Sequence, residues 1–215
     1  MAHIHLQDGS FTLFWVFVWW ALCLALIGVA LILVRRKKPD PNKIAVAAFV
    51  TAAAFAVFQV QIPIAGGIHL NLTPLIGILA GPVLAPLVAF IINILSAAIG
   101  HGGWSLIGAN AVVNISEVLV GYYTFSALKK IIKTPFYCAG IATFSGLFVG
   151  NVVMIAIILI SGIQGVNQPQ AQVLAGLSLV AAVNMGVAVI EAFVTGFIVS
   201  SITRIRPDLL NGSQP

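Results

Sequence analysis

Residues 11–34 read FTLFWVFVWWALCLALIGVALILV, and the basic residues 35–38, RRKK, follow them directly. The run is longer than the about 20 helical residues that cross a bilayer core of about 30 Å. It is too long for the apolar region of a signal peptide, has no Lys or Arg before it, and ends in a basic cluster that stops transfer. The stretch therefore predicts a retained transmembrane helix.

The composition extends this prediction to the whole chain. Hydrophobic residues make up 60% and charged residues only 7% of the sequence, and the mean hydropathy is +1.12. A soluble domain needs a far more charged surface, so we expect a multi-pass, all-α protein of the cell (plasma) membrane. The net charge of +5 is interpreted as a topology signal in the lipid bilayer and not as a sign of nucleic acid. Cys23 and Cys138 have no metal-site or CxxC spacing and are expected to be structural thiols.

Seven apolar segments are predicted along the chain. One of them, 72–81, would reach only about 15 Å as a helix, and Gly81-Pro82 ends it. The predicted spans are residues 11–34, 43–64, 72–81, 83–100, 106–128, 136–162 and 171–202. We expect one transmembrane domain over residues 1–215, made of an N-terminal metal-binding segment (1–10), a helical bundle (11–203) and a cytoplasmic tail (204–215).

The basic residues decide between six and seven crossings. With the N-terminus outside and seven crossings, all ten Lys and Arg of the chain fall on the cytoplasmic side, as the positive-inside rule requires. With residues 72–100 as a single crossing, Lys129, Lys130 and Lys133 would fall outside. We therefore predict seven transmembrane helices with a short third one, an external N-terminus that folds back into the bundle, and a cytoplasmic C-terminus.

The same topology places every histidine of the chain at the outer face. His3 and His5 lie in the N-terminal segment, His69 in a Gly-rich turn that continues to Asn71, and His101 in a second Gly-rich loop. The chain is thus predicted to have an outer surface that carries histidines and an inner surface that carries basic residues.

The first three residues, Met1-Ala2-His3, have a spacing that suits a divalent metal. An X-X-His terminus offers the α-amine, two backbone amides and an imidazole, four nitrogens that match the tetragonal preference of Ni²⁺ or Cu²⁺. If Met1 is removed, histidine becomes the second residue, three nitrogens remain, and His69 is the obvious fourth donor. Both arrangements are open from the sequence. The alternative is a chance pattern in a disordered tail, but the segment is short and lacks the composition of one.

Two other features lie within the spans. Glu117 and Glu191 are intramembrane acids, which are costly and often functional. We favour a structural role, in which each is protonated or bonded across helices to Asn93, Asn114, Asn151, Asn184 or Ser116. Ala48, Ala52 and Ala56 form a strip of small residues that allows close helix approach, either within the chain or against a partner.

These residues together resemble the substrate-binding (S) components of nickel and cobalt energy-coupling-factor (ECF) transporters of the NikM/CbiM type. The resemblance is carried by His3-Ile4-His5-Leu6-Gln7-Asp8-Gly9, by Gly66-Gly67-Ile68-His69-Leu70, and by Gly102-Gly103-Trp104-Ser105-Leu106-Ile107-Gly108-Ala109-Asn110. It covers about residues 3–130 well and the remainder by span pattern only. The motifs are specific as a set.

The resemblance implies a planar metal site built from a buried N-terminus. Its ligands would be Met1, Ala2 and His3, completed by the side chain of His69. From the sequence itself, His5, Asn71 and His101 are candidates to lie beside these ligands. In that family the histidine normally follows the initiator Met directly, so Ala2 changes which amine and amide bind. The metal would be the transported substrate and not a cofactor.

The resemblance also implies partners, and it makes the chain a transport subunit and not an enzyme. They are a transmembrane coupling (T) subunit, two cytoplasmic ATPase subunits and a small auxiliary membrane subunit. Ala48, Ala52 and Ala56 would form the docking surface. Two alternatives stay open: a vitamin-binding S component, and a proton-coupled secondary metal carrier that uses Glu117 and Glu191.

Overall fold

The computed structural model of the chain describes residues 6–58, 61–62, 68–166 and 168–207. These residues form six α-helices and two short strands that pair antiparallel. In chain order the elements are α1 (Leu13–Lys37), α2 (Pro41–Phe58), β1 (Gln61–Ile62), β2 (Ile68–His69), α3 (Thr73–Ala98), α4 (Ile107–Leu128), α5 (Pro135–Ser161) and α6 (Gln170–Ile205).

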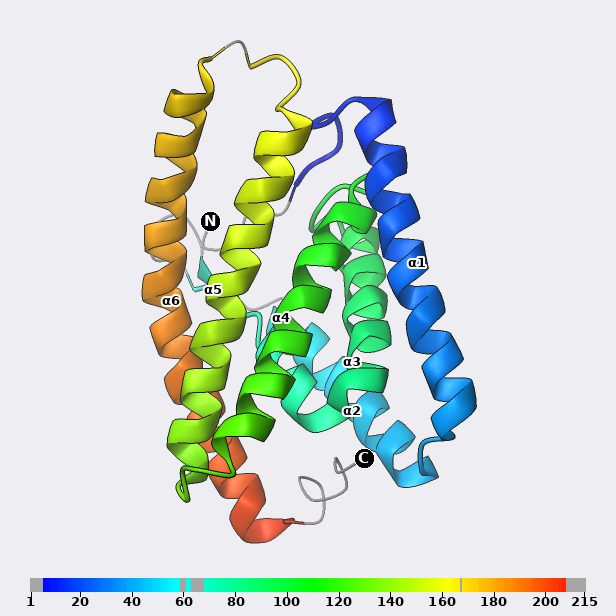
Figure 1. Cartoon of the computed structure of the whole chain (residues 1–215), viewed down its shortest axis with the longest axis vertical. Coiled ribbons are helices and arrows are strands. Elements are labelled where there is room, and N and C mark those ends of the chain that lie inside the picture. The colour runs from blue at the N-terminus through cyan, green and yellow to red at the C-terminus, as the bar shows by residue number, and fades with distance from the viewer. Residues whose placement is uncertain (1–5, 59–60, 63–67, 167, 208–215) are drawn as a thin grey trace.

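The helices form an elongated bundle in which α4 is central (Figure 1). It packs against α1, α3 and α5, while α6 packs on α5 and α2 packs on α3. Five of the helices are long and apolar enough to cross a membrane, and α2 is a shorter apolar helix. Large apolar side chains such as Phe17, Phe49 and Phe197 are exposed on the outside, as lipid contact requires. The prediction of an all-α, multi-pass membrane protein is confirmed.

The α3 helix is divided at Gly81. Gly81 has a φ of 75° and a ψ of 172°, a conformation that glycine adopts without a Cβ clash. The arm before it lies across the bundle, because Leu72 bonds to α6 and Pro74 lies against Gly121 of α4 and Gly146 of α5. The arm after it leads to the loop before α4.

The break at Gly81 lies where the sequence predicted it. Residues 72–81 and 83–100 were expected as two spans, and in the structure two helical arms of α3 meet at Gly81; the number of seven crossings stays a prediction. The span predicted over 43–64 is too long, since α2 ends at Phe58 and residues 61–62 are a strand. Pro63 disfavours the α conformation at the residue before it, in agreement with the strand that contains Ile62.

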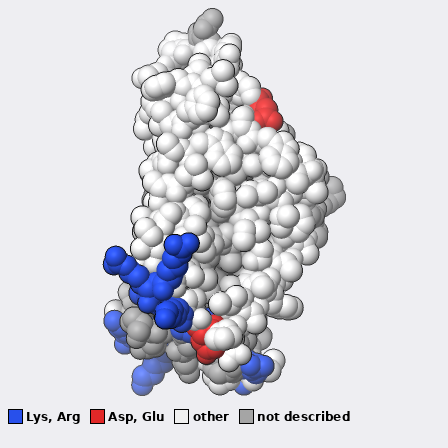
Figure 2. Space-filling model, turned by 90° about the vertical axis from the view of Figure 1, so that its right-hand side faces the viewer, with Lys and Arg blue, Asp and Glu red and all other residues white. Residues whose placement is uncertain are grey.

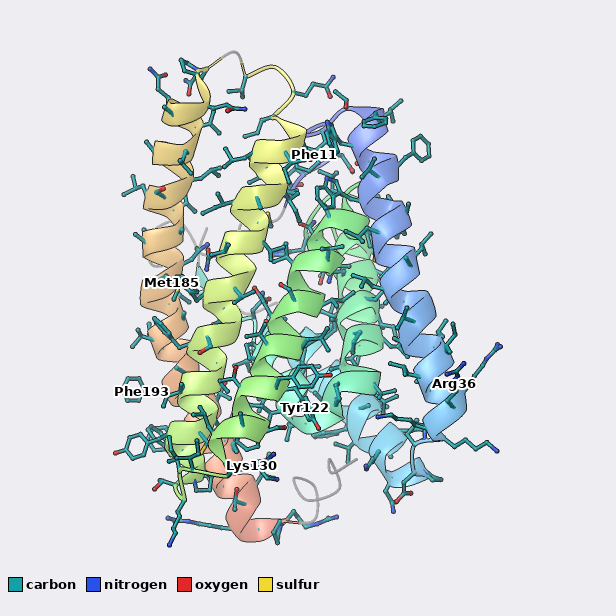
Figure 3. The ribbon with its side chains drawn as sticks, viewed as in Figure 1. Phe11, Arg36, Tyr122, Lys130, Met185 and Phe193 are labelled. Atoms are coloured by element: carbon teal, nitrogen blue, oxygen red, sulfur yellow. The ribbon has the colours of Figure 1, made fainter. Side chains whose placement is uncertain are left out.

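All ten basic residues lie at one end of the bundle. They sit at the junctions of α1 with α2 and of α4 with α5, and at the end of α6. Figure 2 shows the blue side chains gathered at this end of the visible face, and Figure 3 places Phe11 at the opposite end from Arg36 and Lys130. The predicted separation of the basic residues from the N-terminal segment is therefore present in the fold.

The first arm of α3 approaches α4 closely through glycine. A Cβ added at Gly77 would lie 2.0 Å from the carbonyl oxygen of Val118. The obstacle is backbone of a packed helix, which cannot rotate away as a side chain can.

We predict that Gly77→Ala lowers the free energy of unfolding by about 1–3 kcal/mol, the usual cost of overpacking a core. The matched control is Gly28→Ala in α1, where nothing lies within 4 Å of the added Cβ and alanine favours the helix. Thermal unfolding of the purified protein in detergent measures both. Equal melting temperatures for the two variants would contradict the close approach.

Candidate metal-binding site

The described chain begins with Leu6, whose backbone is held by one side chain of α4. Leu6 N donates to Asn110 Oδ1 at 3.2 Å, and Asn110 Nδ2 donates back to Leu6 O at 3.3 Å. Gly103 N also donates to Leu6 O, at 3.1 Å. Both Leu6 and Asn110 are buried. A single amide thus satisfies both backbone groups of Leu6 and fixes the N-terminal segment within the bundle.

The next anchor of this segment is Asp8. Its carboxylate accepts from the backbone N–H of Trp104 at 3.2 Å and of Ser105 at 2.8 Å, and from Ser105 Oγ at 2.5 Å. These hydrogen bonds, the Ser105 hydroxyl first, lower the pKa of Asp8 from its ordinary value of 3.8. A carboxyl with a depressed pKa stabilises the fold above its unfolded pKa and loses that contribution as the pH falls through the folded value. The anchor is therefore intact at neutral pH.

The remaining neighbours of the segment are also at this end of the bundle. Gln164 N, in the α5–α6 loop, donates to Ser10 O at 2.9 Å. Gly103 has no room for a side chain, because a Cβ there would lie 2.4 Å from Asp8 N. The segment over residues 6–10 therefore joins the 99–106 loop, α4 and the α5–α6 loop.

The start of α3 is held by the two intramembrane acids. Asn71 N donates to Glu191 Oε1 and Leu72 N to Glu191 Oε2, both at 3.0 Å, and Thr73 Oγ1 donates to Glu117 Oε2. Both carboxylates are buried, with exposed fractions of 0% for Glu191 and 3% for Glu117. The structural role expected for both acids agrees with these bonds, whose partners differ from those expected. The acids hold three consecutive residues at the end of the segment that carries His69.

Leu72 adopts an unusual backbone conformation at this point. Its φ of 50° and ψ of 21° are left-handed, which costs a residue with a Cβ about 1–2 kcal/mol. The turn lets the chain pass from β2 into α3, and its backbone N–H points to a carboxylate instead of a helical carbonyl.

Asn110 and Glu117 lie on one face of α4. They are seven positions apart, which corresponds to two turns of helix and about 10.5 Å along the axis. Asn114 lies between them on the same face, and the exposed fractions of the three are 4%, 6% and 3%. One buried polar stripe on α4 therefore carries the anchor of the N-terminal segment at one end and an anchor of α3 at the other.

The predicted ligands can now be placed against these anchors. Met1, Ala2, His3 and His5 lie outside the described residues. His69 is in β2, opposite Gln61, and its role as a ligand stays a prediction. Within the described ranges no group of three or more His, Cys, Asp or Glu forms a candidate metal cluster.

Two other predicted residues are described. Asn71 is buried and lies next to Glu191. His101 is half-buried in the 99–106 loop, and burial lowers its pKa from 6.5, which favours the neutral imidazole. Asp8 and Asn110 belong to motifs quoted from the sequence, but no local pattern indicates that they hold the N-terminal segment.

The alanine strip is on the outside of the molecule. Ala48, Ala52 and Ala56 are all exposed, whereas Ala47 and Ala54 on the other side of α2 are buried. Of the two possibilities open from the sequence, packing within the chain does not use this strip.

The chain is similar in sequence to proteins of one family. The family described as the cobalt uptake substrate-specific transmembrane region, CbiM, matches residues 5–209. The cobalt transport protein CbiM of Sorangium cellulosum is 34% identical over 59% of this chain, and the match covers 59% of that protein, less than two thirds of its length. The putative cobalt transport protein CbiM 1 of Methanocorpusculum labreanum is 28% identical over 96% of this chain and 92% of its own.

The fold is also found in solved structures. The crystal structure of a transition metal transporter superimposes with a TM-score of 0.77 over 98% of both chains, at 18% identity. A truncated transition metal transporter gives 0.75 over 95% of this chain and 99% of its own, at 19% identity. At these identities the likeness is one of fold.

We predict that Asn110→Leu releases the N-terminal segment. Leaving the backbone N–H and C=O of Leu6 without this partner costs about 1–3 kcal/mol. Hydrogen exchange of peptides over residues 6–10 should accelerate, and Asn110→Asp, which keeps the acceptor and loses the donor, should fall between.

The control is Asn93→Leu. Asn93 is buried like Asn110, but its side-chain amide donates to Ala89 O of its own helix and not to the N-terminal segment. Exchange of residues 6–10 should be unchanged in this variant. Unchanged exchange in Asn110→Leu would show that the segment is held by other contacts.

Proposed function

The chain belongs to the CbiM family of cobalt uptake substrate-specific transmembrane proteins, and from that premise we propose that it captures Ni²⁺ or Co²⁺ at the outer face of the cell membrane. It acts as the substrate-binding component of an ECF transporter, whose partner subunits drive uptake by ATP hydrolysis. The metal is its substrate, and the chain itself catalyses no reaction.

The observation that carries this proposal is the shared face of α4. Leu6 is anchored at Asn110 and Thr73 at Glu117, about 10.5 Å apart along the helix. His3 is three residues before Leu6 and His69 four before Thr73, so the chain allows reaches of up to about 10 Å and 13 Å. The two segments that carry the predicted ligands are thus anchored close enough to meet at one metal ion.

The chemistry of these segments suits a nitrogen site. With Met1 retained, the amine, two amides and the imidazole of His3 supply four nitrogens; with Met1 removed, His69 supplies the fourth after the amine, one amide and His3. Such donors suit Ni²⁺, and a site with less planarity accepts Co²⁺. No carboxylate is needed, in agreement with an outer end that has few charges.

We assign the outer face to the end of the bundle that carries Leu6. All ten Lys and Arg lie at the other end, which the positive-inside rule places in the cytoplasm. In this orientation the C-terminus is cytoplasmic. The α2 helix and the first arm of α3 are then the second and third of seven membrane segments.

The exposed alanine face of α2 is the proposed contact with the coupling subunit. Ala48, Ala52 and Ala56 let a partner helix approach closely in lipid. The two ATPase subunits would act from the basic end, and a small auxiliary membrane subunit completes the complex.

We predict that His3→Ala weakens Ni²⁺ binding at least about 100-fold, and that His69→Ala does the same in the chain from which Met1 is removed, because even residues that only support a ligand change metal affinity by 10–100-fold. Isothermal titration of the purified chain with Ni²⁺ and then Co²⁺ measures this. His101→Ala is the control, with at most a small change expected. Unchanged affinity in both ligand variants would exclude the proposed site.

We predict that Ala52→Trp prevents co-purification with the coupling subunit, because the indole holds the partner helix away from α2. Ni²⁺ affinity of the isolated chain should be unchanged. The control, Ala182→Trp, adds the same side chain at an exposed position of α6. Intact assembly of Ala52→Trp would assign docking to another surface.

A further inference from the structure

We propose that Glu191 is a positioning residue of the metal site, which holds the backbone next to His69 in place from α6. This inference rests on the proposed function, because it gives Glu191 a part in metal binding. Glu191 is fully buried in α6, whose one basic residue is Arg204, 13 positions further along the chain. Its hydrogen bonds to the backbone give a buried carboxyl group there a structural role.

Two hydrogen bonds of Glu191 are made to backbone, and they use both oxygens of its carboxyl group. Oε1 accepts from Asn71 N and Oε2 from Leu72 N, each at 3.0 Å. Charged acceptors make shorter and stronger hydrogen bonds than neutral ones. These bonds join positions about 120 residues apart in the sequence, so they set where the end of the β1–β2 segment lies relative to α6.

Only Leu70 lies between His69 and Asn71. A displacement of Asn71 therefore passes directly to His69, whose backbone is further constrained by its pairing with Gln61 in β1. Glu191 also stabilises the left-handed conformation of Leu72, because its Oε2 accepts from Leu72 N. Loss of Glu191 would leave this turn without its acceptor.

Glu117 provides a comparison within the same region. It is also a buried glutamate, but it accepts from the side-chain hydroxyl of Thr73, one residue further along the chain, and not from the backbone N–H groups of Asn71 and Leu72. An amide oxygen in Glu117→Gln can still accept from this hydroxyl. In Glu191→Gln one of the two backbone N–H groups faces an NH₂ group and loses its acceptor. Both substitutions replace a carboxyl group by an amide, and they differ in the hydrogen bonds to Asn71, Leu72 and Thr73 that they break.

The first experiment needs no metal. Hydrogen exchange of the purified apo chain should accelerate in peptides that contain Asn71 and Leu72 for Glu191→Gln and stay near wild type for Glu117→Gln. Peptides over residues 6–10, anchored at Asn110, serve as an internal control and should not change. Wild-type protection of Asn71 and Leu72 in Glu191→Gln would overturn the inference, whether or not the chain binds metal.

The second experiment uses Ni²⁺ as the probe. Glu191→Gln should weaken Ni²⁺ binding about 10- to 100-fold, the range found when a group that orients a ligand is lost, and should shift the d–d absorption of bound Ni²⁺ because the geometry of the site changes. Glu117→Gln should do neither. A merely structural role would lower the melting temperature of Glu191→Gln and leave the spectrum unchanged.

The remaining outcomes are also decisive. Equal losses of affinity in the two variants would show that the buried charge and not the position of the backbone matters, which overturns the inference. If the wild-type chain binds neither Ni²⁺ nor Co²⁺, the proposed function fails, and the exchange experiment alone decides whether Glu191 holds the segment.

Discussion

Backbone that leaves the helical hydrogen-bond ladder inside an apolar bundle must find partners in the protein, because hydrocarbon offers none. Two such places are buried in this chain, Leu6 and the stretch before α3. Each has a buried polar side chain that bonds to its backbone groups, Asn110 for Leu6 and Glu191 for Asn71 and Leu72. The buried polar residues of α4 and α6 therefore lie where irregular backbone enters the bundle.

The parts of the fold that follow from local composition could be predicted from the sequence. Apolar runs predicted the positions of the five long helices. The basic residues predicted that α1 joins α2, and α4 joins α5, at the same end of the bundle. The break at Gly81 was expected, but the direction of the arm before it was not. That direction depends on where Leu72 and Pro74 meet α6, α5 and α4, and no periodicity of a single segment contains this information.

The candidate site divides in the same way. The spacing of Met1-Ala2-His3 and the outer placement of His69 are local features, and they suggested chemistry directly. The anchors could not be predicted, because each joins two residues that are far apart in the sequence, by 104 positions for Leu6 and Asn110 and by 120 for Asn71 and Glu191. The sequence does contain a signal for the α4 stripe, since Asn110, Asn114 and Glu117 follow one helical face. What it lacks is any sign of which backbone that face would meet.

A chelate made from a chain terminus gains affinity only if the terminus is ordered before the metal arrives. Each residue that is fixed on binding costs about 1–2 kcal/mol of backbone entropy, so a free ten-residue tail would cancel much of the metal's binding energy. Here residues 6–10 are already fixed by Asn110, Asp8 and Gln164, and the stretch before α3 is fixed by Glu191 and Glu117. In the proposed metal site these anchors reduce the number of residues whose backbone has to be fixed on binding. The buried polar residues of α4 and α6 would then contribute to affinity without touching the ion, because they order the described parts of the two segments in advance.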